Sequence, residues 1–582
     1  MSAEYIQKDQ IRDKLNFRET FRFLWRFTVG HRLQFFAFTV LVFLGGILGA
    51  LAASRFGNII EELTNKATID NLELYTLAAF EMLSIILVFL GRRGLSITAL
   101  HSIVNLREHL FKNMKKLPMS YYDREPAGRI VTRLTHDVDV LESFYSGTLA
   151  RLLSVFMSAT TVIIVMLQNT WWLGLVAALL TLPSILLVWF FKEDSHQFYR
   201  LYSRTSSAIT ARLAEFLNGM TVIRSFGLEE WTQKRLKERL DAFLSAADDV
   251  NRFNSWMRPA TLFLTQLPTV FIFVMGSILF TKGALGLGIL VAYLRLSDRL
   301  ARPAGALMME IHQIQSATAS TERLTTFLSE DTEVFQEQPE TFQLNGSLHF
   351  ENISMRYAPD FPWVLENFNL KIQPGDKIGI MGRTGSGKST LISLLTRLYP
   401  YQKGQMYMNA TPIDTFDVAA LRSQIAFVSQ NTFMMPGSIR DNLSLGRDFP
   451  DEHIIKACKS TGLWELLVQS DRNLESSVES QGANFSQGEG QLFALTRALI
   501  QDPAIMVLDE ATANLDSILE DKVQAAIEHV SKGRTSIFIA HRLSTLTRCD
   551  RVLILQNGKL IQEIKGYELK NPSAEILHHL EA

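Results

Sequence analysis

A glycine-rich segment that follows a short apolar run has the residue types and spacing needed to bind phosphate groups. The run is Lys377–Met381, and the segment after it comprises Gly382, Arg383, Thr384, Gly385, Ser386, Gly387, Lys388, Ser389 and Thr390. In such a G-x-x-x-x-G-K-S pattern, glycines let backbone N–H groups surround the phosphates, the lysine reaches the β- and γ-phosphate oxygens, and the serine hydroxyl binds Mg²⁺. A chance glycine-rich turn would rarely combine this spacing with a preceding strand and a following helix, expected at Leu391–Leu398. The pattern therefore predicts a site for ATP and Mg²⁺.

Two acids follow a second apolar run further along the chain. The run Ala504–Leu508 leads into Asp509 and Glu510. Beside a phosphate site, the first carboxylate would hold Mg²⁺ and the second would orient or deprotonate the attacking water. Two acids at a strand end are a weak signal alone, but together with the glycine-rich segment they predict ATP hydrolysis.

The elements that must position these residues alternate between short apolar strands and helical stretches. The apolar runs that predict strands are Lys377–Met381, Ile425–Val428, Ile505–Leu508 and Ile537–Ile539. Such alternation is typical of an α/β domain with a largely parallel sheet. We therefore predict an α/β P-loop ATPase domain at 346–582, preceded by a polar linker at 312–345.

The N-terminal part of the chain is apolar enough to lie in a membrane. No charged residue occurs from Leu33 to Ser54 or from Leu152 to Phe191, and about 20 apolar residues in a helix cross the hydrocarbon core. The polar break Gln168–Thr170 divides the longer stretch into two spans. We predict an α-helical membrane domain at 1–311, with six spans at about 33–54, 74–93, 147–167, 171–191, 259–281 and 285–303.

Basic residues indicate how these spans are oriented. Lys and Arg concentrate in 1–32, 92–151 and 192–258, whereas the alternate connections carry few. Because positive charge marks the cytoplasmic side of a membrane protein, both termini and the two long connections are expected in the cytosol. Each long connection has helical composition, so the membrane helices should continue beyond the bilayer.

Composition limits the other possibilities. The 582 residues are 47% hydrophobic and 20% charged, which excludes a disordered or collagen-like chain. The formal net charge of −1 gives no support for a nucleic-acid partner. Cys458 and Cys549 are too few for a disulfide framework. Free thiols in a reducing compartment are expected, with a buried pair of thiols as the alternative.

Six spans followed by one ATPase domain resemble, over nearly the whole chain, a half-transporter of the ABC exporter superfamily. The resemblance implies that Tyr357 stacks on adenine, although a core tyrosine is the alternative. It also implies that Gln430 contacts Mg²⁺ and senses the membrane domain, that Asp516 lies at a dimer seam, and that His541 contacts the γ-phosphate. With Glu510, the residues Gln430 and His541 would form the catalytic set.

Two cytoplasmic segments, at about 117–137 and 214–226, resemble the tips that contact the ATPase domains in this family. ATP would clamp two ATPase domains together, the tips would move, and the membrane helices would switch between inward- and outward-open states. Ordinary cytosolic helices are the alternative for either segment alone.

The signature motif departs from the family pattern. Phe485-Ser486-Gln487-Gly488-Glu489 stands where the family has Leu-Ser-Gly-Gly-Gln. Ser486 and Gly488 are retained and would cap the γ-phosphate across the dimer. Glu489 places a negative charge near a triphosphate, which is repulsive by about a kcal/mol or more at roughly 5 Å.

This departure implies a heterodimer, because each ABC site pairs the phosphate loop of one chain with the signature of the other. The partner would be a second half-transporter with an intact signature. In this respect the chain resembles the MdlB-like subunit of heterodimeric bacterial multidrug-type exporters. That resemblance implies an integral protein of the bacterial cytoplasmic membrane, in contact with lipid, with its ATPase domain in the cytosol.

Charged residues in the predicted sixth span have two interpretations. Arg295, Arg299 and Arg302 fall on one helical face, with Asp298 beside them. Because a charge facing lipid is costly, they would line a wet cavity that favours an anionic or amphiphilic substrate. Alternatively, this half of the helix lies in the cytosol, with Asp298 paired to a neighbouring arginine.

The main functional expectation is ATP-driven export of hydrophobic or small amphipathic compounds. A lipid flippase or a peptide exporter would share this architecture. From a different class, a nucleotide-gated regulator or channel subunit is a further alternative, which Glu510 and His541 disfavour because a pure sensor does not need them.

Overall fold

The chain folds into two compact units, which we describe separately. The computed structural model describes residues 17–570, except 67–70, 334–344, Asn431, 510–516 and 541–542. The helical unit comprises residues 1–115 and 127–330, and the ATPase unit comprises residues 116–126 and 331–582.

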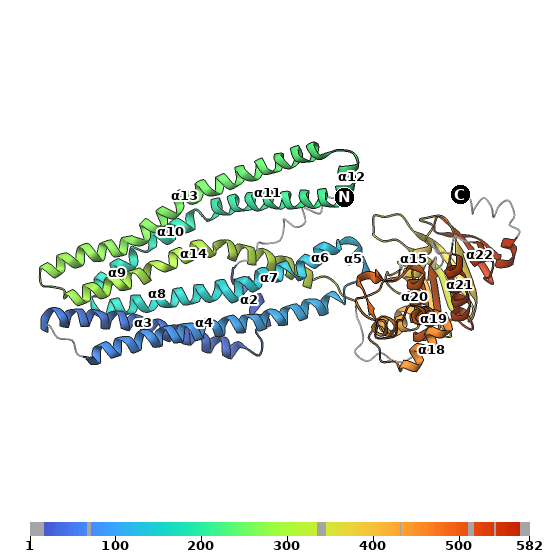
Figure 1. Cartoon of the computed structure of the whole chain (residues 1–582), viewed down its shortest axis with the longest axis horizontal. Helices are drawn as coiled ribbons and strands as arrows, with labels where there is room; N and C mark the ends of the chain where they lie inside the picture. Colours follow the sequence, from blue (N-terminus) through green and yellow to red (C-terminus); the bar gives the residue numbers. More distant parts are fainter. Residues whose placement is uncertain are drawn as a thin grey trace. The chain divides into compact units, whose positions relative to one another are not determined.

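Long helices that run side by side make up the helical unit (Figure 1). Its first helices are α2 (Phe17–Phe27), α3 (Arg32–Lys66), α4 (Asn71–Met114), α6 (Ala127–Leu134), α7 (His136–Glu142), the π-helix η1 (Ser143–Leu149) and α8 (Ala150–Asn169). The remaining helices are α9 (Trp171–Leu179), α10 (Leu182–Phe190), α11 (Lys192–Asn218), α12 (Met220–Ser225), α13 (Glu229–Thr281) and α14 (Leu287–Leu328).

Five helical stretches among the described residues are long and apolar enough to cross a membrane. They are Arg32–Thr64, Asn71–Met114, Ala127–Gln168, Trp171–Asn218 and Glu229–Thr281. The fourth bends between α9 and α10, where Pro183 occupies the first turn of α10. All but the first two residues of the predicted sixth span, 285–303, lie in α14, which carries Arg295, Asp298 and Arg299 and is not among the five. A total of six spans therefore stays a prediction.

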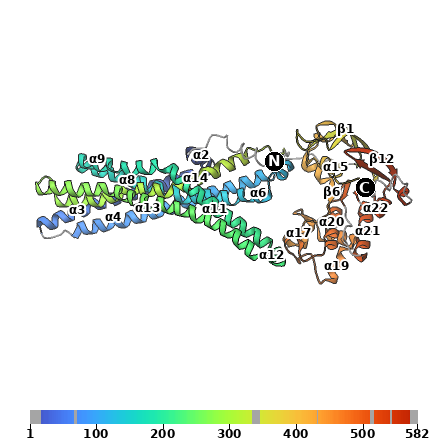
Figure 2. The same ribbon diagram turned by 90° about the horizontal axis from the view of Figure 1, so that it is seen from above.

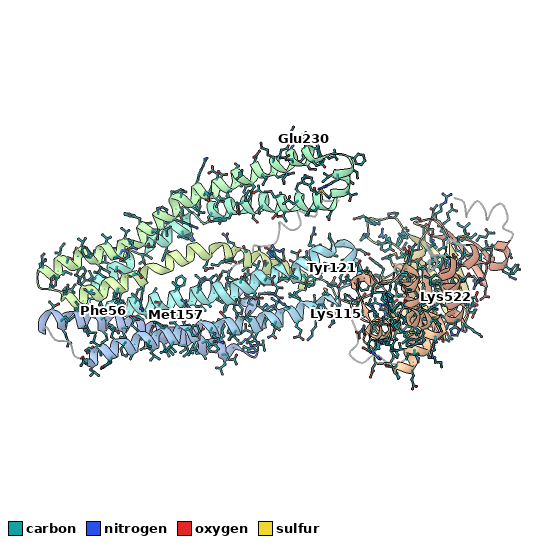
Figure 3. The ribbon with its side chains drawn as sticks, viewed as in Figure 1. Phe56, Lys115, Tyr121, Met157, Glu230 and Lys522 are labelled. Carbon is teal, nitrogen blue, oxygen red and sulfur yellow. The ribbon has the colours of Figure 1, made fainter. Side chains whose placement is uncertain are left out.

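The helices are much longer than the spans predicted inside them. Helix α13 has 53 residues, and at about 1.5 Å per residue it is roughly 80 Å long. A hydrocarbon core measures only about 30 Å. Helices α11 and α13 form a hairpin with α12 at its tip, near Glu230 (Figures 1 and 3). The predicted segment 214–226 thus comprises the end of α11 and the whole of α12.

The structure differs from the predicted linker at 312–345. Helix α14 continues to Leu328 without a break. Its polar residues form part of a helix because Ser320 and Arg323 both donate hydrogen bonds to the buried carboxylate of Asp137 in α7. A polar composition alone does not distinguish such a helix from a linker.

Glycines let α3 and α4 approach closely. A Cβ atom on Gly45 would lie 2.7 Å from the Cγ2 of Val88, and one on Gly91 would lie 2.6 Å from the Cγ2 of Val42. Ser84 donates a hydrogen bond of 2.7 Å to the carbonyl oxygen of Gly45. Small residues with a polar bond between helices are typical of packing in a membrane.

The described residues of the ATPase unit form two main sheets (Figure 2) and a two-stranded sheet of β7 (Gly437–Ser438) and β8 (Ser477–Val478). Within the described ranges, a six-stranded sheet has the order β12-β11-β3-β10-β9-β6, and a four-stranded sheet has the order β2-β1-β4-β5. The first comprises β3 (Lys377–Met381), β6 (Ile425–Val428), β9 (Ile505–Asp509), β10 (Thr535–Ile539), β11 (Arg551–Gln556) and β12 (Lys559–Lys565). The second comprises β1 (Leu348–Met355), β2 (Leu365–Ile372), β4 (Lys403–Met408) and β5 (Thr411–Pro412).

Strand pairing confirms a largely parallel sheet. Only β12 runs antiparallel to its neighbour in the six-stranded sheet of the described residues. The second sheet, which the sequence interpretation did not include, is antiparallel. Helices of this unit are α5 (Met119–Arg124), α15 (Lys388–Leu395), α16 (Val418–Ser423), α17 (Ile439–Ser444), α18 (Asp451–Thr461), α19 (Leu463–Gln469), α20 (Gln487–Gln501), α21 (Ser517–Ser531) and α22 (Leu543–Leu546).

The central strands are buried on both faces, which explains their apolar runs. In β9, Ile505 and Val507 belong to a core shared with α15 and the antiparallel sheet, whereas Met506 and Leu508 belong to a core shared with α18 to α21. Successive side chains of a strand point to opposite faces, so a parallel strand between two layers must be apolar throughout.

Both cysteines are buried free thiols of the ATPase unit. Burial raises the pKa of the Cys458 and Cys549 thiols to about 12. They are therefore almost fully protonated at neutral pH and are unreactive.

Candidate functional site

The parallel strands bring the predicted phosphate and acid residues to one edge of the sheet. Ile539 of β10 pairs with Ile380 of β3 on one side and with Asp509 of β9 on the other. Val428 of β6 pairs with Leu508 in the same register. Since the carboxyl ends of parallel strands meet at one edge, the glycine-rich segment, Asp509 and the residues after β6 emerge together.

Three predicted residues lie outside the described part of the chain. Glu510 directly follows β9, Asp516 directly precedes α21, and His541 follows β10 by two positions. Their assigned roles stay predictions.

The glycine-rich segment has a backbone that only glycine adopts without strain. Gly385 and Gly387 have φ angles of 82° and 102°. A Cβ on Gly387 would lie 2.8 Å from the Cδ2 of Leu365, and one on Gly382 would collide with the carbonyl oxygen of Leu555. Gly387 is the N-cap of α15, and no side chain caps this helix. A phosphate bound here could therefore accept hydrogen bonds from backbone N–H groups in the first turn of α15.

Two side chains of this segment fit a triphosphate. The Lys388 ammonium donates to the carbonyl oxygens of Gly382 and, at 3.0 Å, of Arg383. Ser386 is 4% exposed, and its hydroxyl has no hydrogen-bond partner among the described residues. A buried polar group without a partner costs about 1–3 kcal/mol, and phosphate oxygens would satisfy it. Arg383, Thr384, Gly385 and Ser389 are exposed around the same loop.

Tyr357 is held in place beside the phosphate loop. Its hydroxyl lies 3.0 Å from the Oγ1 of Thr390, and its ring makes an edge contact with Tyr399, with centroids 4.8 Å apart. The side chain is nevertheless 41% exposed. This combination of fixed position and open surface suits stacking on an adenine.

Tyr399 connects this region to the first predicted tip segment. Its hydroxyl donates a hydrogen bond to the carboxylate of Asp123 in α5. The backbone N–H of Glu333 donates to the carbonyl of Lys116 at 2.6 Å in the same part of the unit. The predicted segment 117–137 is thus divided, because α5 belongs to the ATPase unit and α6 to the helical unit. Neither Tyr399 nor its bond to Asp123 carried a signal in the local sequence.

Oxygen donors at the sheet edge could hold Mg²⁺ together with a triphosphate. The candidates are the Ser389 hydroxyl, the Gln430 amide and the Asp509 carboxylate. Hard oxygen ligands of this kind suit Mg²⁺, which keeps water and substrate phosphates in its coordination shell. Among the described residues, no group of three or more His, Cys, Asp or Glu side chains could hold a metal ion alone.

Gln491 in α20 is a site residue that sequence reasoning missed. It is 2% exposed, and its amide donates to the carbonyls of Gln430 and, at 3.3 Å, of Ser429. The backbone of the Gln430 loop is therefore attached to the helix that begins at the signature motif.

The signature motif begins α20 with an internal cap. The N-cap hydroxyl of Ser486 accepts from the N–H of Glu489 at 3.3 Å, and the Ser486 N–H donates to the Glu489 carboxylate at 2.7 Å. An Arg472 nitrogen lies 3.9 Å from the same carboxylate, and the Arg472 guanidinium stacks over the ring of Phe485 at 4.3 Å. Ser486 itself is exposed and Gly488 is buried.

The expected repulsion of a triphosphate stays a prediction, and the geometry adds that the Glu489 carboxylate is engaged within its own chain. Its charge is partly neutralised by the helix N-terminus and by Arg472. The pattern Ser486-x-x-Glu489 is a capping box, which is readable from the sequence. The acid supplies an acceptor for the Ser486 N–H, while the Ser486 hydroxyl accepts from the N–H of Glu489.

Two family models match the chain. The model described as ABC transporter transmembrane region matches residues 35–301. The model described as ABC transporter matches residues 365–513. Apart from residues 116–126, the first match lies in the helical unit. The second contains the phosphate loop, the signature motif and Asp509.

Curated relatives and a solved structure agree with these matches. A fatty acid ABC transporter ATP-binding/permease protein of Mycobacterium bovis is 30% identical over 86% of this chain and 78% of its own length. An ATP-dependent lipid A-core flippase of Pseudomonas fluorescens is 30% identical over 81% of this chain and 79% of its own length. The structure of a bacterial Atm1-family ABC exporter with ATP bound has a TM-score of 0.79 at 21% identity. It covers 95% of this chain and 99% of that chain. That likeness shows the same fold.

Proposed function

The chain belongs to the ABC transporter family as an exporter half-transporter, and we propose that it works in a heterodimer that exports amphipathic compounds. In that assembly the chain supplies a competent phosphate loop and the acids of one ATP site. A second half-transporter with an intact signature motif completes this site. The heterodimer lies in a bacterial cytoplasmic membrane, with its ATPase domains in the cytosol.

The observation that carries this proposal is the contrast between two helix N-termini of the ATPase unit. No side chain caps α15, so its first N–H groups can receive a phosphate. The Ser486 hydroxyl caps α20, and the Glu489 carboxylate, which accepts from the Ser486 N–H, places an anion where the partner's γ-phosphate would dock. One face of the chain thus favours the triphosphate, and the other is a weakened complement for the partner's nucleotide.

The proposed reaction assigns a role to each of four residues of the chain. Tyr357 stacks on the adenine, and Lys388 exchanges the carbonyls of Gly382 and Arg383 for phosphate oxygens. Glu510 accepts a proton from the attacking water, and His541 contacts the γ-phosphate. Mg²⁺, when bound, neutralises charge that develops on the phosphates.

Movement of the ATPase unit would reach the membrane helices through α5, which carries the Asp123 bond to Tyr399. The second tip, α12, would act on the partner. Alternation between inward- and outward-open states then exports the compound.

Names of the relatives support an amphipathic substrate. One relative is named for fatty acids and another for a lipid A core, and both molecules join an anionic group to acyl chains. A lipid flippase is therefore the second candidate function.

Coexpression tests the heterodimer. The chain purified alone in lipid nanodiscs should hydrolyse ATP about tenfold or more slowly than a complex with a half-transporter that carries Leu-Ser-Gly-Gly-Gln, because a complete site needs its donors in place. The matched control is the same complex with Glu510→Gln, which should be inactive. Full ATPase activity of the chain alone would refute the heterodimer.

A further inference from the structure

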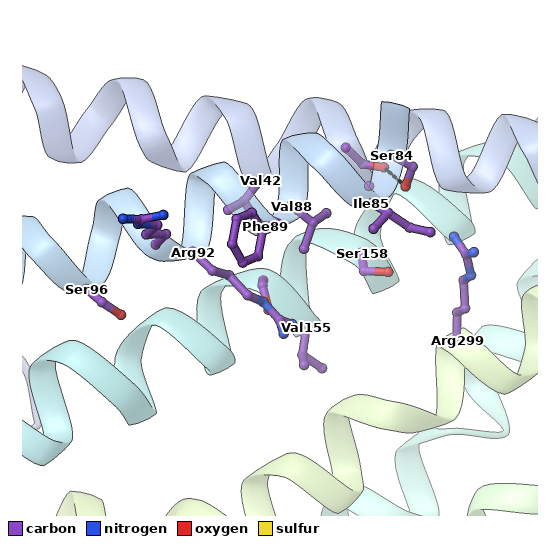
Figure 4. A pocket seen from close by; sticks show the side chains of 14 residues that line it. Val42, Ser84, Ile85, Val88, Phe89, Arg92, Ser96, Val155, Ser158 and Arg299 are labelled. Atoms are coloured by element: carbon purple, nitrogen blue, oxygen red, sulfur yellow. Dashed lines mark hydrogen bonds between the residues drawn. The ribbon is translucent and has the colours of Figure 1, made fainter. Parts of the chain in front are cut away.

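A cavity of about 560 Å³ lies inside the helical unit, between α3, α4, α8 and α14 (Figure 4). Its volume falls in the range of small-molecule sites, about 300–1,000 Å³. Part of its wall is apolar, with Val42, Val88 and Phe89. The rest carries serine hydroxyls and arginines. A cavity with both kinds of wall fits a ligand that is itself part polar and part apolar.

The charge on this lining has one sign. Arg92, Arg93 and Arg299 line the cavity, and no Asp or Glu among the described residues does so. A guanidinium at membrane depth is costly, and such residues usually mark a substrate path. The cationic lining is therefore the feature that a function should explain.

Two of the arginines are positioned by neighbouring helices. Arg92 of α4 donates from its Nε to the Ser154 hydroxyl of α8 at 3.1 Å. The Nη2 of Arg299 lies 3.9 Å from a carboxylate oxygen of Glu81, and its guanidinium packs against Gly49, where a Cβ would collide with it. In the view of Figure 4, the side chains of Arg92 and Arg299 lie apart, with Ser158 between them.

We propose that this cavity binds an amphipathic anion, with a carboxylate or phosphate headgroup attracted to its cationic lining, which includes Arg92 and Arg299, and an acyl chain against Val42, Val88 and Phe89. Arginine matches both headgroups because its planar donors form paired hydrogen bonds with carboxylate or phosphate oxygens. The inference names the substrate class of the proposed exporter and rests on that proposed function.

Helix α14 supplies a matched control. Arg295 lies one turn before Arg299 on the same helix, and its guanidinium stacks over the ring of Phe56 at 4.3 Å. It does not line the cavity. The sequence placed Arg295, Arg299 and Arg302 on one face, and the structure separates the first two by their surroundings. The side chain of Arg302 lies outside the described residues.

Equilibrium binding to the full chain tests the proposal. The chain and its partner, as isolated, are placed in nanodiscs of uncharged phosphatidylcholine without nucleotide, in a Lys388→Ala background that removes phosphate binding at the ATPase site. The probes are dodecyl phosphate, dodecanoate, dodecanol and inorganic phosphate. The better of the two anionic amphiphiles should bind about tenfold or more tightly than dodecanol, the size of a lost hydrogen bond to a charged group. Inorganic phosphate should bind weakly, since it lacks the chain.

Variants then locate the site. Arg299→Gln and Arg92→Gln should each weaken binding of the anionic amphiphile about tenfold, whereas Arg299→Lys should lose less and Arg295→Gln should lose nothing. Ser158→Leu, which keeps every charge and fills the cavity, should also weaken binding. This variant keeps the proposal testable if the arginine variants fail to fold.

Several outcomes would overturn the proposal. They are equal affinity for dodecanol, tight binding of inorganic phosphate alone, or equal losses in Arg295→Gln and Arg299→Gln. Because binding is measured without turnover, anion binding by a complex that hydrolyses no ATP would contradict the proposed exporter and leave this site standing. ATPase activity without anion binding would contradict this site and leave the proposed exporter standing.

Discussion

Helices α15 and α20 of the ATPase unit begin in opposite ways. Each has N–H groups at its first turn that no residue of the helix backbone can satisfy. At α15, glycines hold the chain open and no side chain caps the helix. At α20, Ser486 and Glu489 satisfy each other's N–H groups. The residues of the first turn therefore decide whether the N-terminus of a helix can bind a ligand or has its N–H groups satisfied within the chain.

Replacing Glu510 should give the largest effect. Glu510→Gln in the assembled complex should lower kcat for ATP by about 10²- to 10⁴-fold, because it removes the proposed general base. Binding of ATP should persist, since the α15 face is untouched. Phosphate release and equilibrium binding measure the two quantities. Unchanged turnover would show that the chemistry does not belong to this chain's phosphate-loop face.

Lys388→Ala tests whether the N-terminus of α15, which no side chain caps, is the phosphate site. Loss of the ammonium should weaken ATP binding by roughly 10- to 100-fold, the range expected for hydrogen bonds to a charged group. The readout is the Kd of a fluorescent ATP analogue. Lys388→Arg, which keeps the charge with a different shape, is the control. Equal affinity in all three proteins would mean that α15 is not the phosphate site.

Tyr357 separates ring stacking from hydroxyl bonding. Tyr357→Ala should weaken ATP binding by about tenfold, since base–aromatic stacking is worth about 1–3 kcal/mol. Tyr357→Phe keeps the ring and loses only the contact with Thr390, so its Kd should stay close to the original. The same fluorescent analogue measures both. A loss in the Phe variant as large as in the Ala variant would contradict adenine stacking.

Substitutions of Glu489 directly test the capped N-terminus of α20. Glu489→Gln keeps an oxygen acceptor for the Ser486 N–H and removes the charge, so ATPase activity of the complex should rise severalfold with little change in Tm. Glu489→Ala also removes the acceptor for the Ser486 N–H and should destabilise the unit by about 1 kcal/mol. Calorimetry and ATPase assays distinguish the two variants. If Glu489→Gln lowered the ATPase activity, the negative charge of Glu489 would support hydrolysis at this signature motif and would not impair it.

A second internal cap predicts a small dependence on pH. Ser438 and Asp441 form a capping box at α17, and hydrogen bonds from Ser438 lower the pKa of Asp441 from its usual 3.8. Because the pKa is lowered in the folded chain, the stabilisation is present above about pH 4 and disappears as the pH falls through the lowered value. The Tm difference between the original chain and Asp441→Asn should therefore shrink from pH 5 to pH 3. A constant difference would contradict this source.

Local sequence predicted the elements whose signals are local. Strands β3 and β6 have the predicted bounds, and β9 is longer by Asp509 alone, because strands buried on both faces have apolar runs with sharp ends. The bond from Tyr399 to Asp123 joins residues 276 positions apart. No pattern within either segment could indicate it. Glu489 is a different case, since its capping box is local, but comparison with a family motif drew attention to its charge instead of its hydrogen bonds.

The segment 116–126 has a consequence for dissection of the protein. It belongs to the ATPase unit, although the chain passes through the helical unit before returning at Asp331. A fragment that starts at Asp331 would lack Asp123, the acceptor for Tyr399, and Lys116, the acceptor for the Glu333 N–H. A soluble fragment that begins at Asp331 therefore lacks part of the ATPase unit. We expect it to bind nucleotide more weakly than the intact chain does.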